Sequence, residues 1–275
     1  MELYKDVSYD LSRRLTEAYS TSFSMSSRLF AKSIRPDIYA IYGLVRVADE
    51  IVDTYDGSDD EKRTLLDTLE RETYLAIERQ YSANPIIHAF ALTVASSRID
   101  RVLIAPFFAS MRMDIGRQYS SENYQEYIYG SAEVVGLMCL KVFCRGDDEQ
   151  YEQLVPGARK LGSAYQKVNF LRDFAADYTQ LERVYFPGVE FDSFSNEQKR
   201  AIEQEIESEF AVANEYIGKL PVTARRAVRA SWVYYRELLK SIQKTSVKDL
   251  RSSRVRVNNA RKLWLLIKVY LGLTR

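Results

Sequence analysis

Apolar residues recur at helical spacing over much of this chain. Between positions 38 and 52 an apolar stripe repeats in steps of three and four residues, as one face of an α-helix does, at Ile38, Ile41, Tyr42, Val45, Ala48 and Val52. No run shows the sustained alternation of a half-buried strand, and no linker rich in Gly, Ser or Pro divides the chain. We therefore predict one all-α domain spanning residues 1–275.

Capping residues and prolines predict where the helices begin. Pro36 is expected to open the helix that carries the apolar stripe, with Gly57 beyond its end. Further helix starts are predicted at Ser58, Asn84–Pro85, Pro106, about Glu122, Pro156, Ser195 and Pro221. Pro106 is expected either to kink or to restart its helix. Residues 184–194 are predicted to form a loop.

The apolar stripe runs into two carboxylates on the same helical face. Asp49 and Asp53 are four residues apart. Like charges at that spacing destabilise an exposed helix by roughly 0.2–0.5 kcal/mol, and by more when they are partly buried. A positive group between them would remove the repulsion, and a hard cation held by oxygen ligands fits that role.

The same arrangement returns far along the chain. One helical face there carries Gln166, Asn169, Asp173 and Asp177. An arginine lies near each acidic pair, Arg46 by the first and Arg172 by the second. Two interpretations stay open from the residues alone: a metal–phosphate site built from both helices, or two solvated acidic faces, which is the usual meaning of such charge patterns.

The composition narrows the function classes. The chain has 275 residues, of which 46% are hydrophobic and 28% charged, with a formal net charge of +1. This balance is that of a globular protein, and it does not indicate nucleic-acid binding. The two cysteines, Cys139 and Cys144, suit a reducing compartment without a disulfide framework. The single histidine, His88, argues against Ser-His-Asp chemistry and against histidine-rich metal sites.

Two segments bear on localisation. The N-terminal residues lack the apolar core of a signal peptide, so a cytoplasmic protein is expected. The run Leu263–Leu271 is apolar but too short to span a bilayer, and Lys268 interrupts it. It is predicted to be either a terminal core helix or an interfacial helix that touches lipid.

The two acidic helices resemble those of the squalene/phytoene synthase family, the head-to-head branch of the isoprenoid synthases. The resemblance covers nearly the whole chain. It rests on several motifs that follow one another at family-like separations: Ser20–Ser24, Ala40–Asp53, Met111–Asp114, Tyr127–Gly136, Leu161–Asp173, Arg183–Pro187 and Arg261–Leu266.

This resemblance implies a fold and a reaction. The fold is an isoprenoid synthase fold, in which helices surround a deep apolar cavity and the two acidic helices face each other across its mouth. The reaction is the Mg²⁺-dependent head-to-head condensation of two prenyl diphosphates through a cyclopropyl intermediate. Within the family the chain looks most like bacterial phytoene synthases, which join two geranylgeranyl diphosphates and need no NADPH. The alternative is a dehydrosqualene or squalene synthase that uses two farnesyl diphosphates.

The resemblance also implies roles for individual residues. Mg²⁺, as more than one ion, would be held by Asp49, Asp53, Asn169, Asp173 and Asp177. Phosphate oxygens would be bound by Arg46 and Arg172, and the flap-side diphosphate contacts would be Tyr19, Ser20, Thr21 and Ser22. Arg254 would close over the second diphosphate.

Tyrosines and one amide complete the implied substrate contacts, namely Tyr42, Tyr127, Gln166 and Tyr235. Tyr127 resembles the tyrosine that assists proton loss, with Tyr129 as the competing assignment. Three positions depart from the common pattern: Glu50 and Ala176 within the acidic motifs, and Thr21 where some relatives carry a basic residue. Because substrate and product would be lipids, peripheral membrane contact is also expected, whereas the oligomeric state is not predicted.

Overall fold

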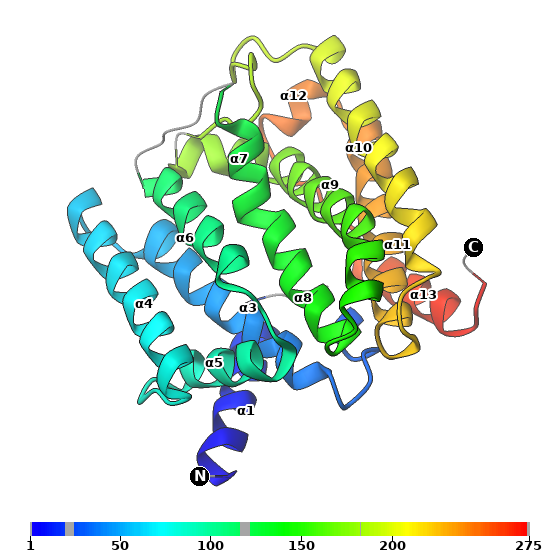
Figure 1. Cartoon of the computed structure of the whole chain (residues 1–275). Coiled ribbons are helices and arrows are strands. Elements are labelled where there is room, and N and C mark those ends of the chain that lie inside the picture. The colour runs from blue at the N-terminus through cyan, green and yellow to red at the C-terminus, as the bar shows by residue number, and fades with distance from the viewer. Residues whose placement is uncertain (1, 20–24, 116–121, 182, 274–275) are drawn as a thin grey trace.

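The computed structural model describes residues 2–19, 25–115, 122–181 and 183–273, and within these ranges it contains helices and no strand (Figure 1). The elements in chain order are α1 (Glu2–Tyr19), α3 (Arg35–Asp49), η1 (Glu50–Thr54), α4 (Asp59–Arg79), α5 (Pro85–Ser97), α6 (Arg101–Ile115), α7 (Tyr124–Ile128), η2 (Tyr129–Glu133), α8 (Val134–Cys144), α9 (Asp148–Leu181), α10 (Asn196–Ile217), α11 (Val222–Lys244), α12 (Val247–Leu250) and α13 (Asn259–Tyr270), where η marks a π-helical turn. The all-α prediction is confirmed.

The predicted capping residues begin their helices. Ser58 and Ser195 each form a reciprocal capping box, with Glu61 at α4 and with Gln198 at α10. The Asn84 side chain accepts hydrogen bonds from the first turn of α5, which Pro85 opens. These caps satisfy backbone N–H groups that have no partner inside the helix, which is why they could be found by inspecting a few residues.

Two prolines lie inside helices. Of the two alternatives for Pro106, a restart is excluded, since α6 runs from Arg101 to Ile115. The prediction for Pro156 was wrong, because the second acidic helix, α9, already starts at Asp148. A proline inside a helix removes the hydrogen bond to the carbonyl four residues earlier. Those carbonyls belong to Val102 and Glu152, which are both exposed, so solvent can replace the lost bond.

The predicted helix over residues 122–145 is interrupted by a π-helical turn. Its parts are α7, η2 and α8, and a similar turn, η1, follows α3 directly. Such turns are rare and are often found at functional sites. Gly130 in η2 is required by a close approach to α6, because a Cβ there would lie 2.3 Å from the backbone oxygen of Pro106.

Helix α9 lies among the other helices and forms much of the core. It packs against α8, η2, α10 and α11, while α3 packs against α1, α5 and α8 (Figure 1). Among the described residues, one segment, Tyr124–Cys144, has the length and apolar composition of a membrane span, but 72% of it is buried inside the protein. That burial is typical of a core helix.

Helix α13 only partly fits the expectation of a terminal core helix. Leu265 and Val269 are buried against the protein, whereas Leu263 and Ile267 on the other side are about half exposed, at 55% and 48%. The apolar run therefore has one packed face and one exposed apolar face.

Candidate active site

The helices enclose a cavity of about 440 Å³ that is polar at one end and apolar at the other. The polar end is lined by Asp49, Asp53, Asn169, Asp173 and Asp177, and the apolar end by Phe30, Ile38, Phe143, Leu154, Gly157 and Leu220. Along α9 the distance from Gly157 to Asp173 is roughly 24 Å at the rise of an α-helix. Two acidic pairs that are far apart in sequence therefore share one cavity with a long apolar interior.

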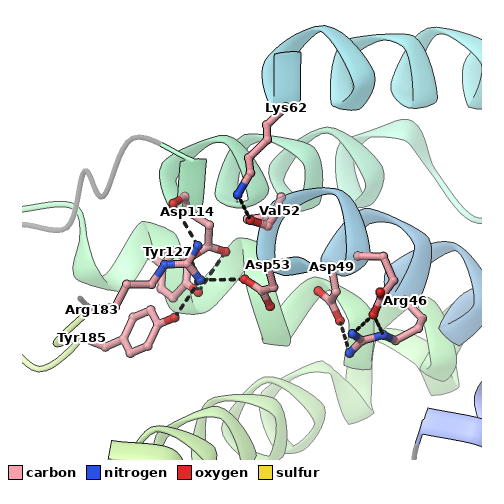
Figure 2. Close-up of polar contacts among 10 residues, drawn as sticks. Arg46, Asp49, Val52, Asp53, Lys62, Asp114, Tyr127, Arg183 and Tyr185 are labelled. Atoms are coloured by element: carbon pink, nitrogen blue, oxygen red, sulfur yellow. Dashed lines mark hydrogen bonds and ion pairs between the residues drawn. The ribbon is translucent and has the colours of Figure 1, made fainter. Parts of the chain in front are cut away.

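The first acidic pair lies where α3 passes into η1. Arg46 Nη1 lies 3.6 Å from Asp49 Oδ2, and its Nε donates a hydrogen bond of 3.0 Å to Glu50 Oε1 (Figure 2). The guanidinium carbon of Arg46 also lies 4.2 Å from the ring centre of Tyr19. Burial, with the charge of Asp53 adding to its effect, raises the pKa of Asp49 to about 7.

The second acidic pair lies on α9 and is held by two arginines. Arg172 makes a two-pronged contact with Asp173, with Nε–Oδ1 and Nη2–Oδ2 distances of 3.0 and 2.6 Å. Arg254 Nε lies 2.7 Å from Asp173 Oδ1. Burial raises the pKa of Asp177 to about 7, and the charges of Asp173 and Asp53 add to the effect. The charge of Asp53 therefore acts on Asp177 although the two residues lie on different helices, as expected when both acidic pairs line the same cavity.

The donor set at this end of the cavity suits a hard divalent cation. Asp and Asn oxygens are the ligands that Mg²⁺ accepts in proteins. Among the described residues, no three His, Cys, Asp or Glu groups already converge on one point. Burial, and after it the charges of neighbouring carboxylates, raises the pKa of both Asp49 and Asp177, so a nearby cation would favour their ionised forms. The residues therefore fit hard divalent cations.

The remaining predicted residues fall in three groups. Tyr42, Tyr127, Gln166 and Tyr235 line the cavity. The Tyr235 hydroxyl donates a hydrogen bond of 3.2 Å to Asn169 Oδ1 and so orients that side chain. Tyr19 lies against Arg46, and Arg254 reaches Asp173 from outside α9. Ser20, Thr21 and Ser22 lie outside the described residues.

The structure separates the two competing tyrosines. Tyr127 lines the cavity and is buried, whereas Tyr129 is not among the described residues that line it. Tyr129 instead lies in η2, where the guanidinium carbon of Arg159 is 5.2 Å from its ring centre. The side chain of Tyr127 stacks on Tyr185 with ring centres 5.5 Å apart.

Three polar residues beside the acidic pairs had no role in the sequence prediction: Asp114, Arg183 and Tyr185 (Figure 2). Arg183 Nη1 contacts Asp53 Oδ1 at 2.8 Å and Asp114 Oδ1 at 3.7 Å. Its Nη2 donates to the backbone oxygen of Asp114 at 3.1 Å. Tyr127 donates a hydrogen bond of 3.0 Å to Asp114 Oδ1. Burial raises the pKa of Asp114 to about 8.

The sequence offered only a weak signal for these residues. Asp114 and Arg183 belong to motifs that carry the family resemblance, but neither lies in an acidic pair. Arg183 follows the end of α9, where the chain is no longer helical and periodicity gives no direction. Only the fold brings it to Asp53, which is 130 residues away in sequence.

Replacing Arg183 by Gln is expected to destabilise the protein by about 2 kcal/mol at pH 8, because a buried countercharge is lost. Burial raises the pKa of Asp114 in the folded protein. The contribution of this carboxyl group to the free energy of unfolding is therefore complete below its ordinary pKa of 3.8 and is lost as the pH rises through about 8. Without Arg183 that pKa rises further. The difference between variant and parent should therefore grow as the pH rises from about 7 to about 9, where Asp114 ionises in the parent, as measured by urea unfolding.

The matched control is Arg101→Gln. Arg101 pairs on the surface with Glu78, with both side chains more than half exposed and an Nη2–Oε1 distance of 2.7 Å. Its loss should change the free energy of unfolding by no more than about 1 kcal/mol. Equal effects of the two substitutions at pH 8 would contradict the countercharge assigned to Arg183.

An all-α enclosure with two acidic helices facing one apolar cavity defines the isoprenoid synthase class. Solved structures share this fold over nearly the full chain. A dehydrosqualene synthase in complex with ligand superposes with a TM-score of 0.83 at 23% identity, covering 98% of this chain and 97% of the other. The squalene synthase HpnC of Alicyclobacillus acidocaldarius gives a TM-score of 0.76 at 20% identity, covering 88% of this chain and 95% of the other.

The squalene/phytoene synthase family model matches residues 16–261, and the chain belongs to this family of prenyltransferases. Among curated relatives, the phytoene synthase of Arthrospira platensis is 26% identical over 94% of this chain and 91% of its own length. The 15-cis-phytoene synthase of Synechococcus elongatus is 28% identical over 93% of this chain and 90% of its own length. The 4,4'-diapophytoene synthase of Staphylococcus haemolyticus is 25% identical over 68% of this chain and 65% of its own length.

Proposed function

We propose that this enzyme condenses two geranylgeranyl diphosphates head to head, through prephytoene diphosphate, to 15-cis-phytoene in carotenoid biosynthesis. The observation that carries the proposal is the cavity, which joins two acidic pairs to a long apolar interior. The residues that line it extend over roughly 24 Å along α9, which gives room for a long prenyl chain. The relatives named as phytoene synthases, which match over almost the whole chain, support the same product.

The overall reaction forms carbon–carbon bonds at the expense of two carbon–oxygen bonds. Each diphosphate leaves with the electron pair of its bond to carbon, and two protons leave the joined chains, so that no oxidant or reductant is needed. Mg²⁺ bound by Asp49, Asp53, Asn169, Asp173 and Asp177 would neutralise the departing diphosphates as a Lewis acid. No NADPH is consumed in this scheme.

The arginines bind and orient the diphosphates. Arg46 and Arg172 lie beside the two acidic pairs, and Arg254 reaches the second of them. A guanidinium presents several N–H donors in one plane, which matches the oxygens of a phosphate group. When a diphosphate enters, these groups exchange part of their contact with carboxylates for contact with phosphate oxygens.

The apolar part of the cavity protects the carbocations. Phe30, Phe143, Leu154 and Leu220 exclude water there. Aromatic faces also stabilise a cation by roughly 0.5–2 kcal/mol each, and Tyr42 and Tyr165 line the same cavity. Exclusion of water prevents the carbocation from being converted to an alcohol, and the aromatic faces lower its free energy.

Tyr127 is placed to assist proton loss. Burial, with the charge of Asp114 adding to it, raises its pKa well above the ordinary value, so the phenol stays neutral. Since its hydroxyl donates to Asp114, its oxygen lone pairs are oriented away from that carboxylate. Where Asp114 is ionised, a fraction that grows as the pH rises toward about 8, Tyr127 can thus accept a substrate proton while it passes its own to Asp114.

The second candidate is condensation of two farnesyl diphosphates to dehydrosqualene, or to squalene with NADPH. The structural likeness to a dehydrosqualene synthase and the diapophytoene synthase relative favour keeping it. Incubation of the purified protein with each diphosphate and Mg²⁺, with and without NADPH, decides between them by product mass. We expect phytoene from geranylgeranyl diphosphate, unchanged by NADPH. A greater kcat/KM with farnesyl diphosphate would overturn the chain-length assignment.

A further inference from the structure

Helix α13 carries several large apolar side chains that are exposed and have no role in the proposed reaction. Leu263, Trp264, Ile267, Tyr270 and Leu271 are 55%, 41%, 48%, 66% and 62% exposed. Their spacing places them on one face of the helix, opposite the buried Leu265 and Val269. A surface helix of a globular protein normally shows polar residues on that side. We call these five residues the α13 face.

The α13 helix carries positive charge and no negative charge of its own. Its charged residues are Arg261, Lys262 and Lys268, of which Arg261 Nε pairs with Glu237 on α11 at 2.8 Å. On the helix itself, Lys268 Nζ lies 3.6 Å from the Trp264 ring centre, and the Arg261 guanidinium carbon lies 4.4 Å from it. Trp with Lys or Arg is the combination that stabilises a helix at the boundary of lipid headgroups and acyl chains.

The α13 face also lies close to the cavity. Helix α13 packs against α11 at the periphery of the molecule (Figure 1), and α11 contributes Tyr235 and Val228 to the cavity wall. A small pocket between these helices is lined by Ala230, Lys262 and Ser26, and Ser26 lines the main cavity as well. A lipid surface against α13 would therefore lie next to one wall of the substrate chamber.

We propose that the α13 face docks on an anionic lipid bilayer. The apolar side chains enter the headgroup boundary, and the surrounding Lys and Arg contact lipid phosphates. Lys262 and Lys268 favour a bilayer over a second copy of this chain, because the lysines of two such faces would repel each other. Docking does not depend on which prenyl diphosphate is the substrate.

The test is co-sedimentation of the full chain with phosphatidylcholine vesicles that contain or lack phosphatidylglycerol. The apolar variant combines Leu263→Ser, Ile267→Ser and Leu271→Ser, and the charge variant combines Lys262→Gln with Lys268→Gln. The matched control combines Leu3→Ser, Val7→Ser and Leu11→Ser on α1, where an exposed apolar row lies among Glu2, Asp6 and Asp10. Thermal unfolding and turnover of soluble substrate verify that each variant is folded.

The parent should partition at least about tenfold more strongly onto the anionic vesicles than onto neutral ones. The apolar variant should lose about tenfold of that partitioning, and the α1 control should stay within about twofold of the parent. The charge variant should bind both vesicle types alike. Equal binding of parent and apolar variant, or binding indifferent to phosphatidylglycerol, would overturn the proposal. A dimer that the apolar variant dissociates, without vesicle binding by the parent, would overturn it in favour of self-association.

Discussion

Replacing Asp53 or Asp173 by Asn is expected to lower the rate of diphosphate release by about a thousand-fold or more at saturating Mg²⁺. Each substitution replaces a negatively charged carboxylate, which would bind metal, by a neutral amide, and the metal would stabilise the departing diphosphate. A thousand-fold loss of rate corresponds to about 4 kcal/mol of lost transition-state stabilisation. Asn keeps the size of the side chain. The two carboxylates come from different helices, η1 and α9, and line one cavity, so both losses should be large. Release of inorganic diphosphate under single-turnover conditions measures the effect.

Asp56→Asn provides the matched control. Asp56 is an exposed acid three residues beyond Asp53 and is not among the described residues that line the cavity. Its substitution should leave turnover within about twofold, as surface changes away from a site do. Circular dichroism should show the same helical content in all three variants. Full turnover by both Asp53→Asn and Asp173→Asn would reject the metal assignment for the two acidic pairs.

Replacing Tyr127 by Phe is expected to lower the rate of product formation by about a hundred-fold, the usual contribution of a positioned proton acceptor. The substitution removes the hydroxyl that links the cavity to Asp114 while it preserves the ring stacked on Tyr185. Asp114→Asn should lower the rate as well at pH values near 8 and above, where Asp114 is ionised, because the amide cannot take the proton that the phenol passes on. Single-turnover formation of the cyclopropyl intermediate, followed by mass spectrometry, is the measurement.

Tyr129→Phe is the control that the structure provides. Tyr129 is two residues away in sequence, but it lies in η2 beside Arg159 and outside the described lining of the cavity. It should keep at least about half of the parent rate. A larger loss in Tyr129→Phe than in Tyr127→Phe would exchange the two assignments and remove Asp114 from the proton path.

Local features of this fold could be predicted from sequence because their causes are local. Ser58, Asn84 and Ser195 begin helices through hydrogen bonds to residues two or three positions away. Pro156 was misleading because its cost depends on what replaces the lost hydrogen bond. The carbonyl it leaves without a partner belongs to the exposed Glu152, which only the folded structure reveals.

The candidate site was predictable in part for the same reason. Asp49, Asp53, Asp173 and Asp177 are recognisable because helical periodicity puts each pair on one face. That the pairs share a cavity follows from tertiary packing, which periodicity does not contain. Arg183 was overlooked because its partners are 69 and 130 residues away and its own segment has no regular repeat.

The central claim is that carboxylates from both acidic helices act on one diphosphate through bound metal. The most direct test is a crystal structure with Mn²⁺ and an unreactive thio analogue of geranylgeranyl diphosphate, in which anomalous scattering locates the metal. The account predicts Mn²⁺ peaks in contact with Asp49 or Asp53 and with Asp173 or Asp177, joined through the same diphosphate. A diphosphate bound without metal contacts to one of the two pairs, or metal peaks outside the cavity, would contradict it.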